Sequence, residues 1–240
     1  MSAEPPATRF RDHTNIALEF FIVALTLLPF LILSYFYASL PPQIPEYLNL
    51  RGDPVVWGRK NLFTVFRLAL MGLDLQLLAF FMKYGLWQRY VARLGQPAGR
   101  FASETLRVMA GLTDWLRVMA GIKLFVSAIE VIFLTNEKFR ALATAARAIS
   151  WISSILGIVG ACAYFYRALR LKRRMSPEPV EARQPVDQTR VRGGVFYYNS
   201  ADPSLFVDRH LFNFANLWTY VFLLSLLSLP FLMFLPALTS

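Results

Sequence analysis

Residues 15–39 read NIALEFFIVALTLLPFLILSYFYAS, and this stretch decides the class of the protein. As a helix it is long enough to cross about 30 Å of hydrocarbon, which takes roughly 20 residues. A secretory signal peptide would have a shorter apolar core, of about 7–15 residues, followed by a small-residue cleavage site. This stretch is longer and shows no convincing site, so we expect a helix that is retained in the membrane.

Other parts of the chain are similarly long and apolar. We expect further membrane helices at about 62–86, 118–134, 143–168 and 215–235. The composition agrees, because 56% of the residues are hydrophobic and 17% are charged, whereas soluble domains are about 45–50% apolar and about 25% charged. Cys162 is the only cysteine, which excludes a disulfide scaffold. The sequence therefore predicts an all-α integral membrane protein with about five transmembrane helices.

The basic residues are distributed unevenly among the connecting segments. Arg and Lys gather at the N-terminus, after the second stretch and after the fourth. The positive-inside rule places these segments in the cytoplasm, so we expect the N-terminus inside and the C-terminus outside. The net charge of +10 is spread over these loops rather than gathered in a basic domain, so nucleic acid is not an expected partner. The expected location is the inner (cytoplasmic) membrane of a bacterium, which the chain crosses several times.

We expect five segments along the chain. They are a cytoplasmic N-terminus (1–14), a four-helix membrane region (15–174) with an outer loop (40–61) and a long third helix (103–135), a cytoplasmic linker and aromatic segment (175–213), and a fifth helix (214–240). Ser103 is the expected N-cap of the third helix. This helix repeats LRVMAG at 106–111 and 116–121. The two copies face about 80° apart on a helix, and we interpret them as a local duplication.

Charged residues within the expected spans match in depth and sign. Arg67 and Asp74 lie on one face of the second helix, and Lys123 and Glu130 have the same spacing in the third. Because these helices run antiparallel, we expect Arg67 to bond Glu130 and Asp74 to bond Lys123, with Arg147 near the outer pair. We interpret this ladder as fixing which helices pair, since an unpartnered charge in the membrane is costly. The alternative interpretation is a proton or ion path.

The fourth helix carries a ridge of small residues, Ser153, Gly157 and Ala161, spaced four apart. This spacing lets two helix backbones approach closely. We interpret the ridge as packing within the chain, and a seam with a second copy or a partner subunit is the alternative.

Patterns typical of enzymes and metal sites are missing from the sequence. It contains no HExxH, CxxC, GxSxG or phosphate-loop pattern. Asp202, Asp208 and His210 are close together but lack matching ligand spacing elsewhere. We therefore expect no catalytic activity, no metal and no cofactor.

The outer loop resembles the signature loop of a known family. Residues 40–60 read LPPQIPEYLNLRGDPVVWGRK, which resembles the LPxxIPxHFNxxGxPDxWGxK pattern of SdpI-type membrane proteins. The histidine of that pattern is Tyr47 here, and the aspartate after the second proline is Val55. The matching residues are Pro42, Ile44, Pro45, Asn49, Gly52, Pro54, Trp57, Gly58 and Lys60.

A second segment, on the expected cytoplasmic side, is similar to another motif. Residues 195–207 read VFYYNSADPSLFV, similar to the pattern YYNxxDPxLFVxxR that occurs with the first motif in multi-pass bacterial membrane proteins. The matching residues are Tyr197, Tyr198, Asn199, Asp202, Pro203, Leu205, Phe206 and Val207. The resemblance implies a non-enzymatic membrane protein. The best understood relatives act in immunity to a secreted toxic peptide and in sequestering a repressor at the membrane.

The expected function is therefore binding, as an SdpI-like immunity, sensing or signalling component. One alternative is an accessory or scaffold subunit of a larger membrane complex, and a second is a small-solute or ion transporter that uses the charge ladder. Five unequal spans do not divide into an inverted repeat, which disfavours the transporter. The expected partners are membrane lipid and a protein in the membrane or at its faces, and a homo-oligomer is also compatible with the sequence.

Overall fold

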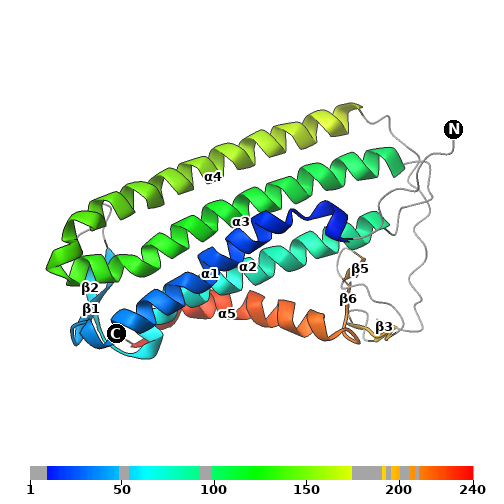
Figure 1. Cartoon of the computed structure of the whole chain (residues 1–240). Coiled ribbons are helices and arrows are strands. Elements are labelled where there is room, and N and C mark those ends of the chain that lie inside the picture. The colour runs from blue at the N-terminus through cyan, green and yellow to red at the C-terminus, as the bar shows by residue number, and fades with distance from the viewer. Residues whose placement is uncertain are drawn as a thin grey trace. The chain divides into compact units, whose positions relative to one another are not determined.

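The computed structural model describes residues 10–48, 54–91, 99–174, 191–192, 196–200, 206–208 and 211–239. These residues are mostly helical (Figure 1). The α-helices are α1 (Ile16–Phe36), α2 (Leu62–Val91), α3 (Gly99–Thr135), α4 (Arg140–Arg174) and α5 (Leu217–Thr239). Short 3-10 turns occur at Phe10–His13, Tyr37–Ser39 and Glu137–Phe139.

Four helical stretches in the described residues have the length and apolar composition of membrane spans. They are Ile16–Ser39, Leu62–Gln88, Glu104–Thr135 and Glu137–Leu171, and Leu217–Leu232 is a shorter apolar helix. Large apolar side chains on these helices are left exposed by the chain itself, such as Phe20 (72%), Ile158 (66%) and Leu224 (68%). Such extensive exposed apolar surface is typical of helices that face lipid.

Side-chain caps define where two of the helices begin. Asn15 Oδ1 accepts a hydrogen bond from the Leu18 amide (3.2 Å), and Asn61 Oδ1 accepts one from the Thr64 amide (2.8 Å). These bonds satisfy backbone donors that have no partner within the helix. The predicted cap at Ser103 is wrong, because α3 already begins at Gly99. Extending an existing helix by a turn costs little, so a local capping residue does not fix where it begins.

The two segments that carry the family resemblance contain short strands. β1 (Gln43–Leu48) and β2 (Pro54–Arg59) form an antiparallel hairpin in which Ile44 lies opposite Gly58. In the other segment the sheet order is β3-β4-β6-β5, with β4 and β6 parallel and the other pairs antiparallel. These strands are β3 (Val191–Arg192), β4 (Phe196–Tyr197), β5 (Phe206–Asp208) and β6 (Leu211–Asn213). The fold therefore adds two small sheets to the expected helices.

The chain divides into two compact units. Unit 1 consists of residues 1–14, 77–113 and 163–227, and unit 2 consists of residues 15–76, 114–162 and 228–240. In unit 1, Phe81 and Phe222 form a buried cluster, and the Phe10 ring meets Phe80, Tyr84 and Trp87 edge-on. In unit 2, a buried cluster joins α1, the hairpin, α2 and α3 through Leu33, Leu40, Ile44, Val65, Ala69, Ala128 and Ile132.

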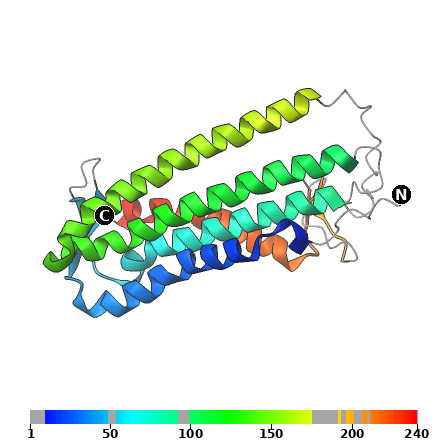
Figure 2. The ribbon, with the colours of Figure 1, turned by 45° about the horizontal axis from the view of Figure 1, so that its top comes forward.

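Figures 1 and 2 both show α3 and α4 of unit 2 running side by side from their connection. Trp115 Nε1 donates a hydrogen bond to the Leu156 carbonyl at 3.0 Å. A Cβ on Gly160 would overlap the Trp115 ring, so glycine is required for this ring to lie against α4.

Candidate functional site

One face of the outer hairpin is fixed to the helices of unit 2. Ile44 is 1% exposed and lies in the buried cluster described above. Lys60, directly after β2, donates from Nζ to the carbonyl oxygens of Leu40 (2.7 Å) and Tyr37 (3.3 Å). Its Nζ also lies 5.3 Å from the centre of the Tyr37 ring. Lys60 thus satisfies carbonyl oxygens just after the end of α1 and ties that end to the base of the hairpin.

Two further contacts hold the hairpin from the side of α2 and within its own pairing. Arg67 is 6% exposed and donates from Nη2 to the Glu46 carbonyl at 3.1 Å. The Glu46 side chain occupies the space that a Cβ on Gly58 would take. Ile44, Gly58 and Lys60 of the resemblance therefore have a structural role, which is to position the strands.

The opposite side of β2 points away from the protein. Burial alternates along this strand, so that Val55 is 63% exposed, Trp57 is 54% exposed, and Arg59 is also exposed. We call these three residues the outer face of the hairpin. An exposed tryptophan beside an apolar and a cationic residue, on a backbone held rigid from behind, is typical of a binding surface.

The three prolines of the first motif lie in or next to the strands of the hairpin. Pro42 precedes β1, Pro45 pairs with Trp57 across the hairpin, and Pro54 begins β2. Asn49 and Gly52 lie outside the described residues. Figure 1 shows the hairpin at the end of unit 2 where α1 ends and α2 begins.

A buried ionic cluster joins α1, α2 and α3 within unit 2. Arg117 is 4% exposed, and its Nη1 and Nη2 donate to the two carboxylate oxygens of Glu19 at 2.7 and 2.8 Å. Its Nε donates to Gln76 Oε1 (3.2 Å), and Gln76 Nε2 donates to the Arg117 carbonyl (2.7 Å). Asp114 Oδ1 lies 3.6 Å from Arg117 Nη1. The planar guanidinium suits this two-pronged geometry, which a lysine would not reproduce.

Sequence reasoning missed this cluster. Glu19 is the single charged residue in 15–39, which is a signal that it needs a partner inside the protein. Arg117 lies one residue before the apolar stretch 118–134, so its position in the sequence does not mark it as that partner. Its distance from Glu19 in the sequence gives no indication that the two side chains meet.

The structure corrects the predicted charge ladder. Among the described residues, Glu130 bonds Arg147 (Nε to Oε1, 2.8 Å) and not Arg67. Asp74 accepts a hydrogen bond from Ser228 Oγ on α5 at 2.7 Å instead of pairing with Lys123. Lys123 is exposed on α3, and the described residues offer its ammonium group no hydrogen bond or ion pair. The expected position of Arg147 beside Glu130 agrees with this bond, but matching depths along the helices does not fix how far each helix is rotated about its axis.

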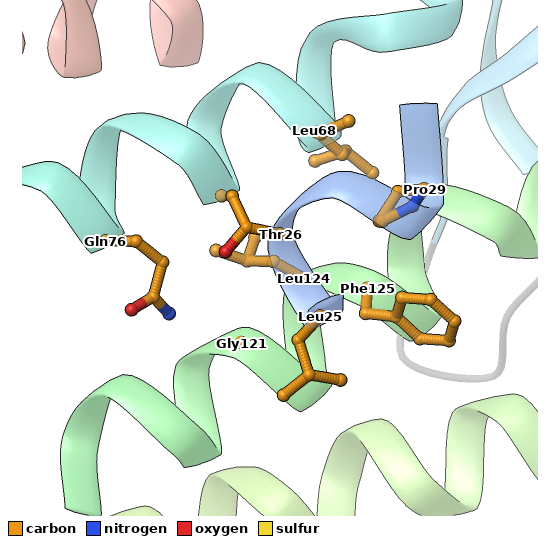
Figure 3. A pocket seen from close by; sticks show the side chains of 10 residues that line it. Leu25, Thr26, Pro29, Leu68, Gln76, Gly121, Leu124 and Phe125 are labelled. Carbon is orange, nitrogen blue, oxygen red and sulfur yellow. The ribbon is translucent and has the colours of Figure 1, made fainter. Parts of the chain in front are cut away.

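The space among α1, α2 and α3 of unit 2 is small. Figure 3 shows the residues that line this space: Leu25, Thr26 and Pro29 of α1, Leu68 and Gln76 of α2, and Gly121, Leu124 and Phe125 of α3. The cavity that they line holds about 10 Å³, which is close to the minimum for one water molecule. These residues therefore leave no room for a hydrated ion, which does not favour a transport path at this place.

The small-residue ridge of α4 faces α3 within the chain. Ser153 is 3% exposed, and a Cβ on Gly157 would lie 3.4 Å from Met119 Cβ. Ser150 Oγ lies 3.5 Å from Ser127 Oγ on α3. Ala161, the third ridge residue, is half-buried. This arrangement matches the interpretation of the ridge as intramolecular packing.

The second motif builds its sheet onto the start of α5 within unit 1. Tyr197 is 5% exposed, and its hydroxyl accepts a hydrogen bond from Asn199 Nδ2 (2.9 Å). Asn213, which is fully buried, donates from Nδ2 to the Asn199 carbonyl (2.9 Å), and its own carbonyl accepts from Thr219 Oγ1 (2.7 Å). Tyr198 is 42% exposed. Tyr197 and Asn199 therefore have structural roles in joining β4 to β6.

Part of that motif cannot be placed. Asp202, Pro203 and Leu205 lie outside the described residues, and of Phe206 and Val207 only the strand β5 is described. The described residues contain no group of three His, Cys, Asp or Glu side chains arranged to hold a metal ion. Asp208 lies in β5, and His210 is outside the described residues.

The fold and its contacts define a mostly helical protein, with helices long and apolar enough to span a membrane and a small hairpin that presents a tryptophan. No protein-family model, curated protein or solved structure matches this chain.

Proposed function

We propose that the protein acts by binding at the outer face of its hairpin, as an SdpI-like immunity, sensing or signalling component of a bacterial inner membrane. The observation that carries this proposal is the contrast across the hairpin. Val55 and Trp57 are 63% and 54% exposed, whereas Ile44 on the opposing strand is 1% exposed. A rigid hairpin with an exposed aromatic side chain lowers the entropic cost of binding.

The proposed membrane arrangement has five crossings, with α5 as the fifth, the N-terminus in the cytoplasm and the C-terminus outside. The two units support it, because the basic segments expected in the cytoplasm fall in unit 1 and the loops expected outside fall in unit 2. Alkaline phosphatase fused after Ser240 is expected to be active, and the same enzyme fused after Met175 is expected to be inactive. Equal activity of both fusions would mean that α5 does not cross.

The binding function is tested with a photo-reactive amino acid in place of Trp57 in living cells. The expected result is one covalent adduct of peptide size, formed with material outside the cell. The matched control carries the same amino acid at Trp151, which is also 54% exposed but lies on α4. Adducts of lipid alone at both positions would contradict the proposal.

A second candidate function rests on the exposed face of α4. In the most apolar stretch of this helix only 11% of the residues are buried by the rest of the chain, compared with 22–28% in the other three helices that could span a membrane. Its exposed side chains include Trp151, Ile152, Ile155, Ile158 and Val159. These residues favour a subunit of a larger membrane complex, in which α4 is covered by another protein. A stoichiometric membrane protein that purifies with the chain in mild detergent, and crosslinks from position 151 but not 57, would replace the first proposal with this one.

A further inference from the structure

We propose that a groove between the first turns of α3 and the last turns of α4 binds the phosphate headgroup of an anionic phospholipid. The groove lies within unit 1 and has a volume of about 490 Å³. This inference concerns a different part of the chain from the outer hairpin, and it stands whether or not the hairpin binds a ligand.

Residues on one face of α3 and one face of α4 line the groove. On α3, Glu104, Arg107, Val108 and Gly111 stand at i, i+3, i+4 and i+7, and on α4, Tyr164, Arg167, Arg170 and Leu171 stand at i, i+3, i+6 and i+7. Residues at this spacing lie on one side of a helix. The groove is therefore lined by three guanidinium groups and one carboxylate, so its net charge is positive.

The three arginines are available to a ligand. Arg107, Arg167 and Arg170 are exposed, and none of them forms a hydrogen bond or ion pair with another side chain in the described ranges. The contrast with Arg117, which is buried against Glu19, shows that this chain can satisfy an arginine internally where it has a carboxylate to offer. Phosphate oxygens match guanidinium donors in charge and in geometry.

The groove combines charged and apolar lining residues, which favours a lipid over a free phosphate. Because α3 and α4 run antiparallel, Glu104, Arg170 and Leu171 lie toward one end, Arg107 and Arg167 near the middle, and Gly111 and Tyr164 toward the other end. Gly111 lets the Tyr164 ring pack closely, since a Cβ there would lie 2.9 Å from Tyr164 Cε1. By helix rise, Arg107 and Arg167 lie about 5–6 Å from the end formed by Gly111 and Tyr164, comparable to the distance from a lipid phosphate to the start of its acyl chains.

The neighbouring residues fit a membrane interface. Phe165 and Tyr166, which follow Tyr164 on α4, are 63% and 66% exposed. Aromatic side chains gather at the depth of lipid headgroups, and basic pockets between membrane helices at the cytoplasmic leaflet are known to hold anionic headgroups. An anionic phospholipid such as phosphatidylglycerol matches the positive charge of the groove, its length and its expected depth at the membrane interface.

The test uses the full chain in nanodiscs of phosphatidylcholine with a minor fraction of phosphatidylglycerol. Lipids that remain bound after extraction are counted by native mass spectrometry. A double variant replaces two of the three groove arginines, Arg107→Gln and Arg167→Gln. It is expected to lower phosphatidylglycerol retention by at least about fivefold. Arg173→Gln is the matched control, because Arg173 is exposed on the same part of α4 but does not line the groove.

Three results would overturn the proposal. They are equal retention by the double variant, an equal loss in Arg173→Gln, and full displacement of the lipid by inorganic phosphate at the same concentration. The second would indicate a general effect of positive charge, and the third a phosphate site without lipid. If the double variant fails to fold, Arg170→Gln alone is expected to show about a fivefold loss. Crosslinking at position 57 is unaffected in every case, so failure here is distinct from failure of the hairpin proposal.

Discussion

The two copies of LRVMAG in α3, at 106–111 and 116–121, have the same sequence and different surroundings. Arg117 in the second copy is 4% exposed and binds both carboxylate oxygens of Glu19. Arg107 in the first copy is exposed and lines the groove against α4. The leucines reverse this pattern, since Leu106 is 4% exposed and Leu116 is 42% exposed. The same leucine and arginine positions are therefore buried in one copy and exposed in the other.

The rotation between the copies explains the reversal. Ten residues turn a helix by about 80° less than three full turns, which is enough to move a residue at the edge of the buried face from one environment to the other, as it does at Leu106/Leu116 and Arg107/Arg117. A buried arginine then requires a carboxylate, and Glu19 of α1 supplies it. The comparison indicates that the environment, and not the motif, decides whether an arginine stabilises the fold or is available to a ligand.

The strongest way to break this comparison is to substitute the two arginines in turn. Arg117→Gln is expected to lower the free energy of unfolding by about 3–5 kcal/mol, because it leaves the Glu19 carboxylate without its cation in a largely buried site. Arg107→Gln is expected to change it by less than about 0.5 kcal/mol, since its side chain is exposed. The measurement is the apparent melting temperature in detergent without added phospholipid.

A double variant separates the charge from the packing. Replacing both partners, Glu19→Gln with Arg117→Met, is expected to recover much of the loss, since removing a buried pair entirely is less harmful than removing one member. Equal melting temperatures for Arg117→Gln and Arg107→Gln would show that the buried cluster does not stabilise the protein.

Much of the helical fold could be predicted from the sequence, because each span is a local property. Apolar length identifies α1, α2 and α4 within about six residues of their observed bounds, and Asn15 is placed at the start of the first span. For α3 apolar length alone gives only 118–134, whereas the helix begins at Gly99. The prolines of the outer loop exclude a helix there. The pairing of Ile44 with Gly58 could not be predicted, since it depends on residues 14 apart meeting in one register.

The site contacts were less predictable, because they depend on rotation and on distant helices. Asp74 accepts a hydrogen bond from Ser228, which lies 154 residues later on α5. Depth matching suggested Lys123 as its partner, but Lys123 faces outward. The spacing of residues within one helix determines which of them share a face. Which other helix packs against that face depends on how all the helices of the unit pack together.

The smallest expected effect on stability comes from substituting the glycines that end the two copies, Gly111 and Gly121. A Cβ on Gly121 would lie 3.2 Å from Gln76 Nε2 and 3.3 Å from Leu25 Cδ1. Gln76 is 6% exposed and already donates to the Arg117 carbonyl at 2.7 Å. It cannot yield without weakening that bond, so the overpacking is expected to cost about 2 kcal/mol. The helix propensity of alanine recovers up to about 1 kcal/mol, so Gly121→Ala is expected to lower the stability by about 1 kcal/mol.

Gly111→Ala is the matched variant in the first copy. Its Cβ would press on the Tyr164 ring at 2.9 Å, but Tyr164 is only half-buried and borders the open groove, so the ring can move aside. The higher helix propensity of alanine, worth up to about 1 kcal/mol, offsets the remaining strain. We expect a melting temperature near that of the wild type for Gly111→Ala and a lower one for Gly121→Ala. The reverse order would mean that Tyr164 is held more firmly than Gln76, and that the first copy, not the second, lies in the better packed part of α3.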